Sequence, residues 1–270
     1  MDRRIPDSLT YLLSRYYQLL EKELGDSIHG VYIYGSIATG SYDDEKSDID
    51  FMTVINGELT DEKIEKIKTV HKDLRGITPD ALKMEGEYVN RYDLEQGRFD
   101  SKYPYIADGR FQEFVPLKYM TLFQVKEFGI TLYGEEFSSI KFDIGWEKVE
   151  KELKERLHGY WLNMAEKKGT LLIDGWVAMI TLNVCRLFYA LENMNFTSKA
   201  AGGKYALENL PTEWHRLIRE ALRIQDGTSK QSLFTSRWER RKALKSFVNY
   251  LSDCLRNNHN SCSFYNDAAM

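Results

Sequence analysis

The sequence predicts an α+β protein in which a small mixed sheet with helices comes first and an all-helical bundle follows. Short apolar and aromatic runs, typical of buried strands, alternate with helical periodicity over roughly the first half of the chain. From Trp146 onwards only helical periodicity is left, and a break at 134–145 separates the two patterns. We therefore expect one domain over 1–140, a second over 141–257 and a disordered tail over 258–270.

Apolar spacing predicts the elements of the first domain. Leucines and tyrosines recur at helical intervals before Gly25, and Thr60 can serve as the N-cap of a second helix. His71 has charged neighbours on that second helix and is expected at the surface, and the polar segment 91–114 is expected to be an irregular loop. We expect helices over 6–24, 60–76 and 117–128, and strands over 31–34, 47–55, 82–89 and 130–133.

The second domain is expected to be a bundle around one nearly apolar helix, residues 176–193. Arg186 stands out there, because a buried arginine needs an anionic partner, which either a bound triphosphate or a structural ion pair would supply. Ser198 can cap the next helix, and Lys199 in its first turn favours a bound anion, because the helix dipole disfavours a cation at that end. Further helices are expected over 146–164, 212–224 and 236–255.

Composition narrows the classes of function. The 270-residue chain is 43% hydrophobic, enough for one large or two modest cores, and its net charge of −4 argues against a broad grip on nucleic-acid phosphates. Three cysteines without metal-ligand spacing fit free thiols in a reducing compartment. Neither a signal-like N-terminus nor an apolar run of about 18 residues is present. We expect a soluble, cytoplasmic protein without a membrane or nucleic-acid partner.

The chemistry of the first domain is concentrated between Gly35 and Asp50. Gly35 and Ser36 directly follow a buried strand and offer backbone N–H groups and a hydroxyl, which suit phosphate oxygens. Asp48 and Asp50 are two positions apart on the next strand, so their carboxylates share a face and repel each other unless a hard cation lies between them. Each feature alone is more often a plain turn or a solvated strand end, but together they favour metal-assisted nucleotidyl transfer.

A third carboxylate is expected on strand 82–89, where Glu85 and Glu87 share a face. A strand–helix–strand crossover would set this strand beside the aspartates. Glu85 would then either ligate the metal or take the proton from an acceptor hydroxyl. Glu87 is the competing candidate, and two solvated glutamates on an edge strand are the alternative without a function. Gly86 between them is unusual, because glycine weakens a strand unless backbone or ligand comes close.

The order Gly-Ser, then Asp-x-Asp on the next strand, resembles the signature of the DNA polymerase beta-like nucleotidyltransferase superfamily. Over its whole length the chain is similar to the two-domain aminoglycoside adenylyltransferases of the streptomycin/spectinomycin type. Their C-terminal block has an arginine, a lysine thirteen residues later and then a Leu-Pro, which resemble Arg186, Lys199 and Leu210-Pro211 here. The similarity is strongest over 30–55, fair over 82–94 and 181–211, and weak elsewhere.

This resemblance implies a nucleotidyltransferase domain followed by the helical bundle, and a monomeric enzyme with ATP bound between the domains. It implies transfer of AMP from ATP to a hydroxyl of a streptomycin- or spectinomycin-class antibiotic, with pyrophosphate released and resistance conferred. It implies one or two Mg²⁺ ions held by Asp48, Asp50 and Glu85, with Glu85 as the catalytic base. The nucleotide contacts that we expect from it are Gly35, Ser36, Ser47, Arg186 and Lys199.

The acceptor half of the family's site does not carry over to this chain. Where the family has acidic antibiotic contacts early in the central helix of the second domain, this chain has Trp176 and Met179, with Asp174 two positions from the expected acid. Three alternatives therefore stay open. They are transfer to another drug such as a lincosamide, transfer to a protein or tRNA, and a nucleotide-binding module without catalysis.

Overall fold

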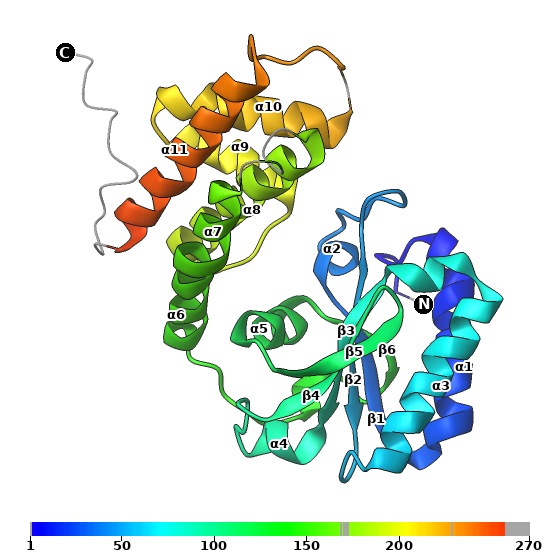
Figure 1. The fold of residues 1–270 in the computed structure, drawn as a ribbon. Helices are drawn as coiled ribbons and strands as arrows, with labels where there is room; N and C mark the ends of the chain where they lie inside the picture. Colours follow the sequence, from blue (N-terminus) through cyan, green and yellow to red (C-terminus); the bar gives the residue numbers. More distant parts are fainter. Residues whose placement is uncertain (1, 168, 170–172, 228, 257–270) are drawn as a thin grey trace. The chain divides into compact units, whose positions relative to one another are not determined.

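The computed structural model describes residues 2–167, 169, 173–227 and 229–256. The chain divides into two compact units, of which the first ends at Gly145 and the second begins at Trp146. The first unit is a sheet with helices on both faces, and the described part of the second is helical (Figure 1). This confirms the predicted α+β class. The tail predicted over 258–270 lies outside the described residues.

The sheet of the first unit is mixed. Its strands follow the order β5-β4-β3-β2-β1-β6, in which β2 and β3 pair in parallel and the other neighbours are antiparallel. Helix α3 (Asp61–Ile77) joins the parallel pair and forms the crossover that the sequence predicted. The strands are β1 (Ile28–Ile33), β2 (Ile49–Ile55), β3 (Met84–Asn90), β4 (Lys102–Ala107), β5 (Arg110–Pro116) and β6 (Ile130–Gly134).

Helices cover both faces of this sheet, with α1 and α3 on one face and α5 on the other (Figure 1). The three predicted helices are confirmed, with ends shifted by one or two residues, and the side chain of Thr60 caps α3 by accepting the N–H of Lys63. The helices are α1 (Asp7–Leu24), α2 (Gly35–Ala38), α3 (Asp61–Ile77), α4 (Arg91–Glu95) and α5 (Tyr119–Phe128), with 3₁₀ turns η1 (Gly25–Ser27), η2 (Pro79–Lys83) and η3 (Phe137–Ser139).

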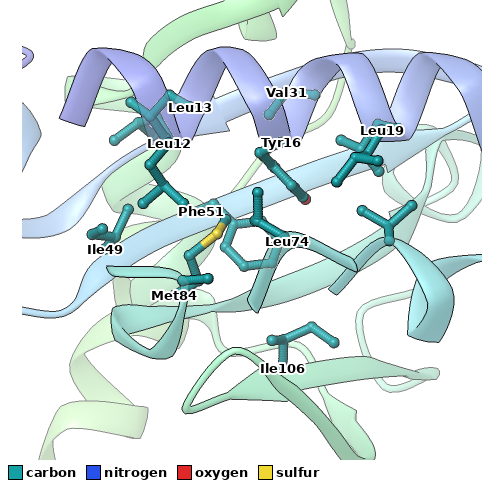
Figure 2. Close-up of a cluster of buried hydrophobic side chains, with 14 of the residues drawn as sticks. Leu12, Leu13, Tyr16, Leu19, Val31, Ile49, Phe51, Leu74, Met84 and Ile106 are labelled. Carbon is teal, nitrogen blue, oxygen red and sulfur yellow. The ribbon is translucent and has the colours of Figure 1, made fainter. Parts of the chain in front are cut away.

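The main hydrophobic core lies between α1, α3 and one face of the sheet (Figure 2). Leu12 and Leu13 of α1 meet Phe51 of β2 and Met84 of β3 there, and all four side chains are buried. Burying a side chain of this size contributes roughly 1.5–3 kcal/mol. Because side chains alternate along a strand, the residues next to Phe51 and Met84 in sequence point to the opposite face of the sheet.

His71 is buried in this core, so the predicted surface position is wrong. It lies three residues before the buried Leu74, and the helical period puts both on the inner face of α3. Its Nε2 lies 2.8 Å from the hydroxyl of Tyr88, which in turn lies 2.9 Å from the hydroxyl of Tyr16. Burial, aided by the charge of Arg75, lowers the pKa of His71 to about 3, so the ring is neutral at physiological pH.

The segment 91–114, expected to be an irregular loop, is mostly regular. It holds α4, and it holds β4 and most of β5, which pair as an antiparallel hairpin. Asp108 and Gly109 form the two-residue turn with φ of 50° and 61°, the pair of positive angles that a type I′ turn requires. This hairpin brings Tyr105 beside β3, because Tyr105 pairs with Glu87.

The second unit is built around α8 (Asp174–Asn193), most of whose apolar side chains are buried, as expected for the central helix of a bundle. The predicted helix over 146–164 is present as α6, a π turn and α7 in succession. Within the described ranges, no helix combines the length and the hydropathy that crossing a bilayer requires. The remaining elements are α6 (Trp146–Arg156), η4 (Leu157–Trp161), α7 (Leu162–Glu166), α9 (Lys199–Asn209), η6 (Thr212–Trp214), α10 (His215–Asp226) and α11 (Arg237–Arg256).

A buried ionic network joins α8, α10 and α11. Glu220 is 0% exposed and Arg240 is 2% exposed, and Oε1 of the first lies 2.9 Å from Nη1 of the second. Glu220 also pairs with Arg223, and Nη2 of Arg240 lies 2.6 Å from Oδ1 of Asp174. Although burial opposes ionisation, hydrogen bonds from Arg223 and its other donors lower the pKa of Glu220 to about 2. Within the described part of the bundle, the buried arginine is thus Arg240, whereas Arg186 is half-buried.

Replacing Glu220 by Gln should destabilise the protein by about 3–5 kcal/mol at neutral pH, because the buried guanidinium of Arg240 and the partly buried one of Arg223 lose a charged partner. Because the pKa of Glu220 is lowered, its carboxylate stabilises the fold fully above the ordinary pKa of 4.5. This stabilisation is lost as the pH falls through the folded value of about 2. The gap between wild type and Glu220→Gln in urea unfolding should therefore narrow below about pH 4. Glu213→Gln, an exposed carboxylate just before α10, is the control and should match wild type. A gap that stays constant with pH would contradict this account.

Candidate active site

Polar side chains gather on the face of the sheet opposite the core. In the parallel pairing of β2 with β3, Asp50 is opposite Glu85, so both carboxylates lie on this face and side by side. Tyr34, directly after β1, donates its backbone N–H to the carbonyl of Asp50 at 3.0 Å, which places it next to the pair. Asp50 and Glu85 are both half-buried, so each carboxylate is partly accessible to solvent.

The turn at Gly35 and Ser36 lies directly against Asp50. Gly35 begins the one-turn helix α2 with φ of 66°, a left-handed conformation that favours glycine. A Cβ at Gly35 would overlap the carboxylate of Asp50. Glycine therefore allows the backbone to approach the carboxylate, and the structure brings the predicted turn and the second aspartate together.

Ser47 and Asp48 precede β2 instead of opening it. β2 begins at Ile49, and Asp48 is exposed at the end of the preceding connection. The hydroxyl of Ser47 accepts the backbone N–H of Asp43 at 3.0 Å, within the same connection. Of the two aspartates, Asp50 is therefore the one whose backbone is fixed by the sheet.

Glu85 accepts a hydrogen bond from the hydroxyl of Tyr105 on β4. Burial, together with that hydrogen bond, raises the pKa of Tyr105, which keeps the phenol protonated as a donor. Sequence reasoning did not single out Tyr105; recognising the hairpin turn at 108–109 would have placed it opposite β3. Gly86 points to the core face, where a Cβ would overlap the carbonyl oxygen of Phe51, and this close approach explains a glycine within β3.

Glu87 lies on the same face as Glu85 but in a different environment. It is 2% exposed, and the hydroxyl of Tyr34 donates to its Oε2 at 3.4 Å. Burial raises the pKa of Glu87 to about 7, with the charge of Lys118 opposing the shift and that of Glu85 adding to it. The alternative of two solvated glutamates on an edge strand is wrong, because β3 is an inner strand and Glu87 is buried.

In the second unit, Arg186 lies on α8 beside the start of α9. Its Nε donates to the carbonyl of Thr197 at 2.9 Å. Lys199 is the first residue of α9 and follows Ser198, whose side chain caps the helix by accepting the N–H of Ala201. The structure therefore brings the two predicted cations to the same end of α9, and both are half-buried.

Two family models match the chain. A nucleotidyltransferase domain matches residues 17–112, and the C-terminal domain of aminoglycoside adenylyltransferases matches residues 172–253. The chain therefore carries a nucleotidyltransferase domain followed by a domain that matches the C-terminal one of aminoglycoside adenylyltransferases. A search of curated proteins gave no match.

A solved structure resembles this nucleotidyltransferase over most of its length. It is the spectinomycin adenyltransferase AAD(9) from Enterococcus faecialis with ATP and spectinomycin. The TM-score is 0.71 and the sequence identity is 18%, and the match covers 91% of this chain and 98% of the other. The likeness is therefore one of fold.

The donor set of this nucleotidyltransferase fits Mg²⁺, the ion that its family implies. Asp50 and Glu85 offer carboxylate oxygens from paired positions of neighbouring strands. Across the part of the chain that the structure describes, no cluster of three or more His, Cys, Asp or Glu side chains is arranged to hold a metal. Mg²⁺ is usually bound by one or two carboxylates together with substrate phosphates, so a carboxylate pair beside a phosphate-binding turn suits it.

Replacing Glu87 by Gln should remove a pH-dependent cost of folding. Between the ordinary pKa of 4.5 and the folded value of about 7, the native state binds more protons than the unfolded state. The free energy of unfolding of the wild type should therefore fall through this window as pH rises. Glu87→Gln lacks this fall and should gain up to about 3 kcal/mol over the wild type between about pH 4 and pH 8.

Urea unfolding of the ligand-free protein over that pH range measures the effect. Glu113→Gln, an exposed carboxylate on β5, is the matched control and should follow the wild type. If the curves for wild type and Glu87→Gln stay parallel at every pH, the buried carboxyl of Glu87 does not titrate as described.

Proposed function

We propose that this protein catalyses the Mg²⁺-dependent transfer of AMP from ATP to a hydroxyl of an aminoglycoside-type antibiotic, of the streptomycin or spectinomycin class, and so confers resistance. The proposal is carried by the parallel register that sets Asp50 beside Glu85, next to the turn at Gly35. The two matching family domains support the reaction class. The similar structure with ATP and spectinomycin supports ATP as the donor and makes spectinomycin the first acceptor to test. The proposal includes a monomer acting in the cytoplasm, where ATP is available.

In the proposed reaction the oxygen of an acceptor hydroxyl attacks the α-phosphorus of ATP. The bond between that phosphorus and the bridging oxygen breaks, and pyrophosphate leaves with the electron pair. Glu85 takes the proton of the attacking hydroxyl as general base. Asp48, Asp50 and Glu85 would hold one or two Mg²⁺ ions. These ions would neutralise part of the negative charge of the phosphates.

Accessibility favours Glu85 over Glu87 as the base. A general base must come within hydrogen-bond reach of the proton that it removes. Glu85 is half-buried and pairs with Asp50, whereas Glu87 is 2% exposed and pairs with Met52. A substrate hydroxyl next to the aspartate can therefore meet the carboxylate of Glu85 without displacing the sheet.

The nucleotide contacts proposed for this enzyme use backbone, hydroxyl and cationic groups. The turn at Gly35 leaves its backbone close to Asp50, as a phosphate-binding turn beside a metal ligand requires. Cations suit a triphosphate, and the two candidates of the second unit, Arg186 and Lys199, both lie near the start of α9. The proposed nucleotide contacts are Gly35, Ser36, Ser47, Arg186 and Lys199.

Asp174, the acid nearest to the place where the family has antibiotic contacts, pairs with Arg240 at 2.6 Å. Its carboxylate therefore serves the fold of the second unit. An acceptor with several ammonium groups would have to find other acids, so the acceptors to be tested include lincosamides as well as aminoglycosides.

Pyrophosphate release from ATP in the presence of Mg²⁺ should depend on one member of a panel of spectinomycin, streptomycin, other aminoglycosides and lincosamides. Asp48→Asn should lose about 100-fold or more of that release, because metal-assisted charge neutralisation is worth several kcal/mol in the transition state. A coupled pyrophosphatase assay measures the rate, and mass spectrometry of the product locates the modified hydroxyl.

Glu45→Gln is the matched control, because it removes an exposed carboxylate from the same connection before β2 and should keep wild-type activity. Release with a lincosamide alone would overturn the acceptor class while keeping the reaction. Tight ATP binding without release from any member of the panel would contradict the proposed function.

A further inference from the structure

Tyr105 contacts Glu85, the proposed base, and is not one of the site residues that the sequence predicted. It pairs with Glu87 across β3 and β4, and its hydroxyl donates to Oε1 of Glu85, two positions along β3. Diagonal cross-strand neighbours of this kind lie within reach of an aromatic side chain. The contact is therefore a consequence of strand register and is built into the sheet.

Among the residues that the structure describes, the hydroxyl of Tyr105 is the one hydrogen-bond donor to the side chain of Glu85. Glu85 is half-buried, so packing alone leaves its long side chain some freedom to change rotamer. A hydrogen bond to a carboxylate is stronger than one between neutral groups and fixes the orientation of the acceptor. With Oε1 engaged in this way, the lone pairs of Oε2 are left for the metal ion and for the proton of the substrate.

Tyr105 is itself held in place. Its backbone belongs to β4, its ring is half-buried, and Nζ of Lys118 lies 5.8 Å from the ring centroid. A tyrosine has two side-chain torsions and loses little conformational entropy when it is fixed. A rigid donor on a strand is therefore well suited to orient a more flexible glutamate on the neighbouring strand.

We propose that Tyr105 is a positioning residue for the transfer reaction, whose hydroxyl holds the carboxylate of Glu85 in the orientation that receives the proton of the acceptor hydroxyl. This inference rests on the proposed function, in which Glu85 is the base. The hydroxyl of Tyr105 then acts through Glu85 alone, and it contributes neither to ATP binding nor to folding.

A double-mutant cycle with Tyr105→Phe and Glu85→Gln tests this. Tyr105→Phe should lower kcat by about 10- to 100-fold, the range expected for losing a hydrogen bond to a charged group. The KM for ATP and the melting temperature should stay near the wild-type values. In the Glu85→Gln background, Tyr105→Phe should cause no further loss, because the group through which it acts is already gone. Equal losses of kcat in the two backgrounds would overturn the proposal.

Tyr103→Phe is the matched control. It removes a phenol two residues earlier on β4, whose hydroxyl donates to Asp93 and to the carbonyl of Arg98 instead of to Glu85. This variant should keep the wild-type kcat. If Tyr103→Phe and Tyr105→Phe lower kcat to the same extent, the effect is a general weakening of the hairpin, which contradicts a specific role for Tyr105.

Crystal structures of the wild type and of Tyr105→Phe test the geometric claim without any turnover. Glu85 should occupy one rotamer in the wild type and a different one, or several, in the variant. An unchanged Glu85 in Tyr105→Phe would overturn the proposal whether or not the enzyme is active. Absence of turnover in the wild type together with a displaced Glu85 would instead reject the proposed function and keep the positioning contact.

Discussion

The parallel pairing of β2 with β3 is the constraint on which the candidate site depends. Its register puts Phe51 and Tyr88 on the face that packs against α1 and α3, and it puts Asp50 and Glu85 on the other face. A slip of one residue in either strand would turn an acid into the core and an aromatic ring out of it. The free energy of burying the core therefore fixes the positions of the carboxylates, and α3, as the crossover between the two strands, makes the parallel pairing possible.

The acidic face that results carries an electrostatic cost. Burial, together with the charges of Glu87, Asp50 and Glu85, raises the pKa of Tyr34 well above its ordinary value. Burial raises the pKa of Glu87, the charge of Lys118 opposes that shift, and the charge of Glu85 adds to it. A concentration of like charge that reduces stability is typical of functional sites, where a bound cation or substrate offsets it.

Local patterns predicted much of this structure because they reflect short-range physics. Helical periodicity predicted α1, α3 and α8, and the strand–helix–strand order predicted the crossover that sets β3 beside β2. The surface position predicted for His71 is wrong because it rests on the polarity of the side chain. The position of His71 in the helical period implies burial, as the structure shows. The hairpin of β4 and β5 was missed although Asp108-Gly109 is a strong turn signal.

Other features of the site could not be predicted, because they arise from tertiary contacts between distant parts of the chain. The different environments of Glu85 and Glu87 depend on which neighbours cover each one, namely Tyr105 in the first case and Tyr34 in the second. The partner of a buried charge is likewise set by packing, as the pairing of Arg240 with Glu220 shows. Burial and hydrogen-bond partners therefore had to come from the structure.

The central claim is that the β2–β3 register builds a carboxylate site that binds Mg²⁺ together with the phosphates of ATP. A crystal structure with Mg²⁺ and an ATP analogue that cannot be cleaved between its α- and β-phosphorus atoms tests this most directly. We expect a metal ion at about 2.0–2.1 Å from oxygens of Asp50 and of the nucleotide phosphates, with Asp48 and Glu85 alongside. A nucleotide bound with its metal away from these carboxylates would contradict the account.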